Sequence, residues 1–260
     1  MADRTVYLHG LPGSPAELLL GGPESCWLDP ARVLAPGRSK LGGNRSAVLS
    51  SLVSQIEQWA GGAPVSLVGF SLGGAIAFDL ARVLGSQVHR IDLVAPAAPL
   101  FLGSFLSEMA GGPLFRLARD HPQIFAIAAA VQGWTARWAP DLLAKALLAD
   151  VRGEDRALAA DPAFRDVMRR ALKDTFALGS TAYRGEVREY VTGTGGDLAT
   201  IAQPVFIWQG DQDNWVPPAM AKALVSALPT GASLTLLPGL SHYSALAWFL
   251  NQFSPGGSQR

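Results

Sequence analysis

The chain contains Val65-Ser66-Leu67-Val68-Gly69-Phe70-Ser71-Leu72-Gly73-Gly74, a segment that joins an apolar run to a series of small residues. The run at 65–68 predicts a buried strand, and residues 72–84 predict a helix. Between them lies the pattern G-x-S-x-G, with Ser71 at its centre. A sharp strand-to-helix turn there would expose the serine hydroxyl and direct the helix N-terminus at an anion formed beside it. The alternative is an ordinary strand–helix junction with a capping serine, so the pattern needs support from the rest of the chain.

Apolar runs and helical stretches alternate on both sides of this segment. Further strands are predicted at Thr5–Leu8, Arg32–Ala35, Val88–Val94, Pro204–Trp208 and Ala232–Leu237, and helices at about 45–60, 72–84, 217–228 and 242–253. Strands that alternate with helices predict a parallel sheet, and continuous apolar runs are typical of strands covered on both faces. The sequence therefore predicts an α/β fold: a mostly parallel sheet of about six strands, doubly wound by helices.

Charged residues are concentrated in the middle of the chain. Residues 100–200 hold 12 basic and 12 acidic side chains, whereas residues 201–260 hold two of each. The apolar residues of 164–172 recur at helical spacing, further helices are predicted at about 122–138, 141–150 and 180–192, and no β-rich run interrupts them. We therefore expect an α/β core of residues 1–98 and 199–260, with an all-helical cap inserted at 99–198.

Composition excludes several classes of protein. Basic and acidic residues number 21 each, so the net charge is zero and there is no basic excess to attract nucleic acid. The single cysteine, Cys26, excludes a disulfide within the chain and a cysteine-rich zinc site. The N-terminus lacks the pattern of a signal peptide, and no apolar run reaches the length of a membrane span. We expect a cytoplasmic protein with no membrane span, no nucleic-acid partner, no cofactor and no metal.

A nucleophilic serine needs a base to accept its proton, and the chain has four histidines. His242 lies in the loop after the last predicted strand, where parallel sheets place reactive groups, which favours it as the base. His9 ends the first strand. For His89 and His121 a surface or packing role is the stronger interpretation.

The base in turn needs an orienting carboxylate, and the oxyanion formed by attack needs two N–H donors. Asp211 and Asp213 follow the strand that ends at Trp208 and are the only acidic residues among the last 60. We assign Asp213 to the base and a turn-forming or capping role to Asp211. The backbone N–H of Leu72 is one expected donor. The loop His9–Pro15 should supply the other, from Leu11.

The sequence resembles the α/β-hydrolase fold superfamily over residues 5–98 and 199–253. The likeness lies in Tyr7–Ser14 (oxyanion loop), Gly69–Gly74 (nucleophile elbow), Pro204–Asp213 with Val216-Pro217 (acid loop) and Gly239–His242 (histidine loop). The resemblance implies a triad of Ser71, Asp213 and His242 in the chain order of the family, and oxyanion donors at Leu11 and Leu72. The family pattern G-x-x-D, counted from Gly210, also selects Asp213 over Asp211. The chain departs from the family in having only eight residues before His9, where members often have two further strands.

These residues predict a serine hydrolase that cleaves a carboxylic ester, or a thioester, of a small to medium apolar substrate through an acyl-enzyme on Ser71. The same scaffold hosts C–C hydrolases, hydroxynitrile lyases and cofactor-free perhydrolases, so these activities remain alternatives. A non-catalytic binding protein is a weaker alternative, because all three triad positions are filled.

The last predicted helix is apolar in nearly every direction and carries no charge over residues 243–253. A helix of this kind is normally buried, so Trp248, Phe249 and Leu250 should be covered. The cover could come from the domain itself or from a second copy in a homodimer, and the sequence does not choose between them.

Overall fold

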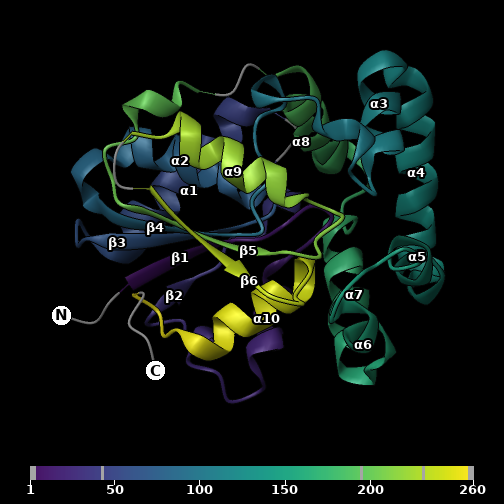
Figure 1. Ribbon diagram of the computed structural model, residues 1–260, viewed down its shortest axis with the longest axis horizontal. Helices are drawn as coiled ribbons and strands as arrows, with labels where there is room; N and C mark the ends of the chain where they lie inside the picture. The colour runs from purple at the N-terminus through teal and green to yellow at the C-terminus, as the bar shows by residue number, and fades with distance from the viewer. Residues whose placement is uncertain (1–3, 42–43, 194–195, 230–231, 257–260) are drawn as a thin grey trace.

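The computed structural model describes residues 4–41, 44–193, 196–229 and 232–256. Its centre is a six-stranded parallel sheet in the order β2-β1-β3-β4-β5-β6. The strands are β1 (Arg4–Leu8), β2 (Val33–Leu34), β3 (Val65–Phe70), β4 (Val88–Val94), β5 (Val205–Gly210) and β6 (Ala232–Leu237). The predicted fold class and strand count are confirmed, and Figure 1 shows the arrangement of the strands.

Helices cover both faces of the sheet, which explains the continuous apolar runs of its central strands. Every residue of β3 is buried. In Figure 1, α1 (Arg45–Ala60), α2 (Gly73–Leu84) and α9 (Pro218–Ala227) lie on one side, and α10 (His242–Gln252) lies on the other. The four helices predicted in these parts of the chain are therefore confirmed, and each of their ends agrees to within one residue.

Between β4 and β5 the described residues form helices and no strand. We call residues 99–198 the helical insertion; Figure 1 shows most of it beyond the end of the sheet toward which β6 points. Its α-helices are α3 (Gly112–Asp120), α4 (Pro122–Trp138), α5 (Pro140–Leu147), α6 (Asp155–Ala160), α7 (Pro162–Thr175) and α8 (Thr181–Thr192). The helices expected near 122–138, 141–150 and 180–192 are confirmed, whereas α3 and α6 were not predicted.

Short 3-10 helices connect the larger elements. They are η1 (Pro15–Gly21), η2 (Cys26–Leu28), η3 (Arg38–Lys40), η4 (Gly85–Gln87), η5 (Leu100–Leu102), η6 (Phe105–Ser107) and η7 (Leu198–Thr200). None of the described helices has the length and apolar character needed to cross a bilayer.

The last helix, α10, is covered from within the chain. Phe249 and Leu250 are fully buried. Trp248 is partly buried, and its ring packs 5.8 Å from that of Trp208. The prediction that this helix is covered is confirmed, and the cover comes from within the chain, from β4, β5, η1 and α6.

Candidate active site

Ser71 lies at the turn between β3 and α2, in strained backbone. Its φ is +54°, in the left-handed region that residues other than glycine rarely adopt. The glycines of the G-x-S-x-G pattern make the turn possible by close backbone approach. A Cβ on Gly69 would lie 2.7 Å from Gly74 Cα, and a Cβ on Gly73 would overlap the carbonyl oxygen of Leu8. The strained turn expected from the sequence is therefore present.

Asp213 and His242 form a buried hydrogen-bonded pair. Asp213 Oδ2 lies 2.8 Å from His242 Nδ1, and both residues are less than 5 % exposed. Asp213 Oδ1 accepts the backbone N–H groups of Trp215 and Val216, at 2.8 Å each. The buried amide of Gln209, which no sequence pattern marked, donates to Asp213 Oδ2 at 3.3 Å. These donors hold the carboxylate in one orientation, facing the imidazole.

His242 also lies beside the elbow that carries Ser71. Its ring centroid is 4.7 Å from that of Phe70, the residue before Ser71, and Trp215 stacks on it at 6.2 Å. Burial lowers the pKa of His242, but the charge and hydrogen bond of Asp213, together with the charges of Asp155 and Glu17, outweigh burial, so the net pKa is raised. The three predicted triad residues are thus brought to one region, from loops at the carboxyl ends of β3, β5 and β6.

The other candidates occupy the positions of ordinary structural residues. Asp211 is exposed, and its Oδ1 accepts the N–H of Gly239 at 2.9 Å, which ties the acid loop to the histidine loop. His89 and His121 are exposed. His9 is buried within the loop that follows β1, where burial and the nearby Arg38 place its pKa well below the usual value.

Two backbone N–H groups are available beside Ser71. Neither the Leu11 nor the Leu72 amide has a hydrogen-bond acceptor among the described residues. Leu72 directly follows Ser71. A Cβ on Gly10 would lie 3.3 Å from Ser71 Cβ, so the loop that carries Leu11 closely approaches the serine. The expected oxyanion donors therefore come from the two segments that meet at Ser71.

A buried carboxylate, Glu17, supports the loop that carries Leu11. Its Oε2 accepts the Tyr7 hydroxyl at 2.6 Å and the Gly10 N–H at 3.1 Å. Its Oε1 is buried, has no hydrogen-bond partner among the described residues, and would overlap a Cβ placed on Gly13. Burial raises the pKa of Glu17 to about 7, because the charged form loses its hydration.

This raised pKa predicts a pH-dependent contribution to stability. Protonated Glu17 favours the folded state, so its contribution is fully present below the unfolded pKa of 4.5 and is lost as the pH rises through about 7. The difference amounts to about 3 kcal/mol. We expect Glu17→Gln, which resembles the neutral acid, to gain stability relative to the wild type between about pH 5 and pH 8 in urea unfolding.

Glu24→Gln is the matched control, because Glu24 is exposed. Other titrating groups cancel when each variant is compared with the wild type at the same pH. A stability difference between Glu17→Gln and the wild type that stays constant with pH would contradict the raised pKa.

Arg38 joins the same loop to the helical insertion. Its guanidinium is fully buried and donates to the carbonyl oxygens of His9, at 2.9 Å, and Gly10, at 3.3 Å. It also forms an ion pair of 2.8 Å with Glu186 of α8. A buried guanidinium is stable only when its donors are paired, so α8 and the loop hold each other in place.

A second contact from the insertion reaches the histidine helix. Asp155, at the start of α6, is fully buried and accepts the N–H groups of Tyr243, at 3.0 Å, and Ser244, at 2.7 Å. These groups belong to the first turn of α10, which begins at His242, so Asp155 satisfies two of the N–H groups at that helix end, where the Ser241 side chain also accepts from the Ser244 N–H. Its negative charge further raises the pKa of His242. Sequence reasoning missed Asp155, because it stands among many charged surface residues of the insertion.

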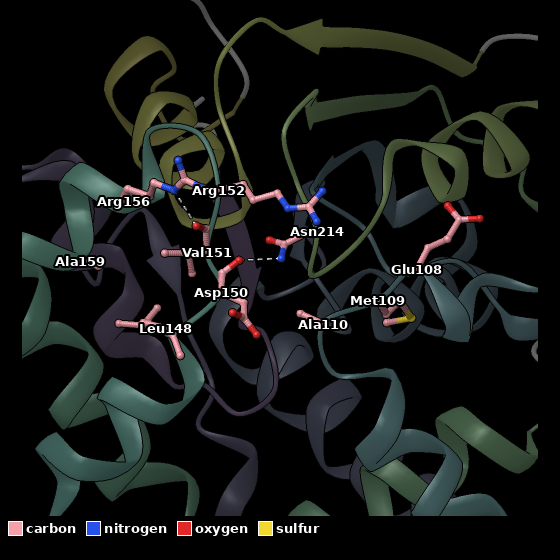
Figure 2. Close-up of a pocket in the computed structure, with 11 residues that line it drawn as sticks. Glu108, Met109, Ala110, Leu148, Asp150, Val151, Arg152, Arg156, Ala159 and Asn214 are labelled. Atoms are coloured by element: carbon pink, nitrogen blue, oxygen red, sulfur yellow. Dashed lines mark hydrogen bonds between the residues drawn. The ribbon is translucent and has the colours of Figure 1, made fainter.

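Two adjoining cavities lie between the insertion and these loops. The inner cavity, of about 250 Å³, has a mostly apolar lining: Leu11, Pro12, Ala110, Gly111, Pro113, Leu114, Phe115, Gln132, Ala146, Leu147, Asp150, Tyr183, Val187 and Trp215. The outer cavity, of about 630 Å³, shares Ala110 and Asp150 with it and is polar (Figure 2). Figure 2 shows Arg152, Asp150 and Asn214 around it, with the Asn214 amide donating to the Asp150 carbonyl at 2.8 Å.

Among the described residues, no group of three or more His, Cys, Asp or Glu is placed to hold a metal ion.

Comparison with known proteins gives one family match. Residues 48–245 match the family model described as serine aminopeptidase, S33. No curated protein matches the sequence.

Solved structures share the fold at low sequence identity. A bromoperoxidase from Bacillus anthracis is 18 % identical, with a TM-score of 0.66 over 96 % of this chain and 90 % of that one. A thermophilic esterase from Thermogutta terrifontis is 16 % identical, with a TM-score of 0.65 over 95 % and 85 %. A 2-hydroxy-6-oxo-6-phenylhexa-2,4-dienoate hydrolase from Rhodococcus sp. strain RHA1 is 16 % identical, with a TM-score of 0.60 over 95 % and 86 %. At these identities the likeness concerns the fold alone.

Proposed function

Because the chain belongs to the α/β-hydrolase family whose model is described as serine aminopeptidase, S33, we propose that it is a serine hydrolase of carboxylic esters or thioesters. The observation that carries this proposal is the buried Asp213–His242 hydrogen bond of 2.8 Å beside a serine in a strained elbow. The esterase among the similar folds is consistent with it. The proposed substrate is a small to medium apolar ester.

In the proposed reaction, Ser71 Oγ attacks the carbonyl carbon while His242 Nε2 accepts the hydroxyl proton. Asp213 holds the other ring nitrogen in its protonated form and stabilises the imidazolium that results. The N–H groups of Leu11 and Leu72 stabilise the oxyanion. His242 then returns the proton to the leaving alcohol or thiol. A water molecule next attacks the acyl carbon while His242 accepts its proton, and His242 passes that proton to Ser71 Oγ as the acid leaves.

The inner cavity supports an apolar group on the substrate. Its lining includes Leu11, which carries a proposed oxyanion donor, and Trp215, which stacks on His242. Its volume of about 250 Å³ is slightly below the usual range for drug-sized ligands, which favours a short acyl or alcohol group. We propose that the helical insertion acts as a cap that forms this cavity above the site.

A panel of p-nitrophenyl esters of increasing acyl length, with an aminoacyl p-nitroanilide as the peptidase arm, tests this function. We expect hydrolysis of the short and medium esters, little activity on the anilide, and covalent labelling by a fluorophosphonate probe. Labelling without turnover of any ester would mean that the protein is a serine hydrolase that acts on another class of substrate. Absence of both labelling and turnover would support a binding protein instead.

The pH profile of the proposed reaction should follow the raised pKa of His242. The base must be neutral to accept a proton, so kcat/KM should rise with pH through an acidic limb above the unperturbed value of about 6.5. Asp155→Asn removes a buried negative charge near His242, and we expect this change to move the limb to lower pH.

Glu154→Gln is the matched control, because it removes an exposed negative charge one residue away. A purely structural role for Asp155 would reduce stability or kcat without moving the limb. A profile that is flat from about pH 5 to pH 8 would contradict a histidine base.

A further inference from the structure

An exposed apolar stripe runs along α4. Ile124, Ile127, Val131, Trp134 and Trp138 are between 55 % and 68 % exposed. Their spacings of three, four, three and four residues place all five within an arc of about 80°. The opposite side of α4 packs into the helical insertion through a second set of residues: Phe125, Ala129 and Ala136. We call the five exposed residues the α4 stripe; α4 itself lies at the outer rim of the molecule (Figure 1).

We propose that the α4 stripe is the interface of a homodimer, in which α4 packs antiparallel against α4 of a second copy. The alternating spacing of three and four residues is the pattern by which two helices interlock their side chains. An antiparallel pair with its two-fold axis between Val131 and Trp134 places Trp134 against Val131 of the partner. The same pairing places Trp138 against Ile127. Each tryptophan therefore meets a β-branched residue, and the stripe is complementary to itself, as a two-fold interface requires.

Leu142 lies beyond the end of α4. It is 63 % exposed at the start of α5, four residues after Trp138. It therefore adds one more exposed apolar side chain close in sequence to the Trp138 end of the stripe.

The area of the stripe is enough for a weak specific dimer. A buried aromatic side chain accounts for about 150–250 Å² and a buried aliphatic one for roughly 60–120 Å². At the observed exposures, the stripe with Leu142 offers roughly 350–600 Å² per copy, so two copies would bury about 700–1,200 Å² before any polar rim is counted. The upper end of this total reaches the lower limit of stable specific interfaces, so a weak, concentration-dependent dimer is expected.

The charge around the stripe favours a second copy over a membrane surface. A helix that binds at a lipid interface carries several Lys or Arg residues on its polar side. α4 has one basic residue, Arg137, whose guanidinium lies 5.4 Å from the ring centroid of Trp138. One basic residue gives little attraction for anionic lipid, whereas the five stripe residues are themselves uncharged, so two identical stripes can meet without repulsion.

Sedimentation velocity over a concentration series tests the proposal. We expect a reversible dimer in the wild type, and we expect Trp134→Glu to raise its dissociation constant at least roughly tenfold. Val83→Glu is the matched control, because Val83 is 56 % exposed on α2, away from the stripe, and its replacement should leave the dimer unchanged. Circular dichroism of each variant establishes that the fold is retained. A monomeric wild type, or a dimer that persists in Trp134→Glu, would overturn the proposal.

A mixing experiment tests the antiparallel pairing itself. Val131→Lys should also dissociate the dimer, but a mixture of Trp134→Glu and Val131→Lys should form a heterodimer, because the new charges face each other across the axis. Failure of the mixture to associate would overturn this arrangement.

Sedimentation of the wild type with phosphatidylcholine vesicles tests the membrane alternative. If the protein is monomeric and pellets with the vesicles, and Trp134→Glu abolishes pelleting, the stripe binds a membrane instead.

Discussion

Replacing Ser71 by alanine is expected to reduce kcat for ester hydrolysis by at least about 10³-fold while the fold is retained. The variant lacks the oxygen that attacks the carbonyl, and any remaining rate comes from binding and from the N–H groups of Leu11 and Leu72. Alanine keeps the Cβ of serine, so the positive φ of this position and its strain are the same in both proteins. The measurement is kcat on the best ester of the panel, together with thermal unfolding.

Ser54→Ala is a suitable control, because it removes an exposed hydroxyl from α1. The fluorophosphonate probe adds an independent readout, since Ser71→Ala should also lose covalent labelling. A folded Ser71→Ala protein that keeps wild-type turnover would show that the reaction proceeds at another residue.

Asp213→Asn is expected to lower kcat by about 10⁴-fold, whereas Asp211→Asn should change it little. Asp213 accepts from Nδ1 of His242, so the proton is kept on that nitrogen and Nε2 is free to act as the base. An asparagine amide can donate to Nδ1, which would fix the opposite tautomer and leave no charge to stabilise the imidazolium. The equivalent change at Asp211 affects only its contact with Gly239.

The two variants carry the same chemical change two residues apart, so each serves as the control for the other. If Asp211→Asn were the inactive protein, the 2.8 Å contact between Asp213 and His242 would be structural and the orienting role would belong elsewhere. If both variants kept full activity, the proposed mechanism would not need a carboxylate.

Much of the fold was predictable because it depends on local patterns. The central strands β1, β3 and β5 are largely buried, so each appears in the sequence as a mostly apolar run followed within two residues by a glycine. The elbow at 69–74 was predictable for a similar reason, since the close approaches of Gly69 and Gly73 leave room for no other residue. α3 and α6 were missed, because they are short, at nine and six residues, and lie among loops of similar composition.

The supports of the site were not predictable, because they depend on residues distant in sequence. Glu17, Arg38 and Asp155 are charged residues of a kind that is normally exposed, yet each is fully or almost fully buried. Arg38 is paired with Glu186, 148 positions away. Asp155 caps a helix that begins 87 residues later. The pattern of neighbouring residues carries no sign of these contacts, and only the folded chain brings the partners together.

The contacts of Asp155, Glu186 and Thr175 also bear on how the protein unfolds. Thr175 of α7 accepts the N–H of Gly13, so the insertion is joined to the loop after β1 as well as to Arg38 and to α10. Opening the insertion would remove the hydrogen-bond partners of a guanidinium, a carboxylate and several backbone N–H groups at once. Each loss costs about 1–3 kcal/mol or more. The insertion and the sheet should therefore melt in a single cooperative transition. For the same reason, exchange of residues 99–198 with those of a relative would yield an inactive chimera unless the acceptors at 155, 175 and 186 were transferred with it.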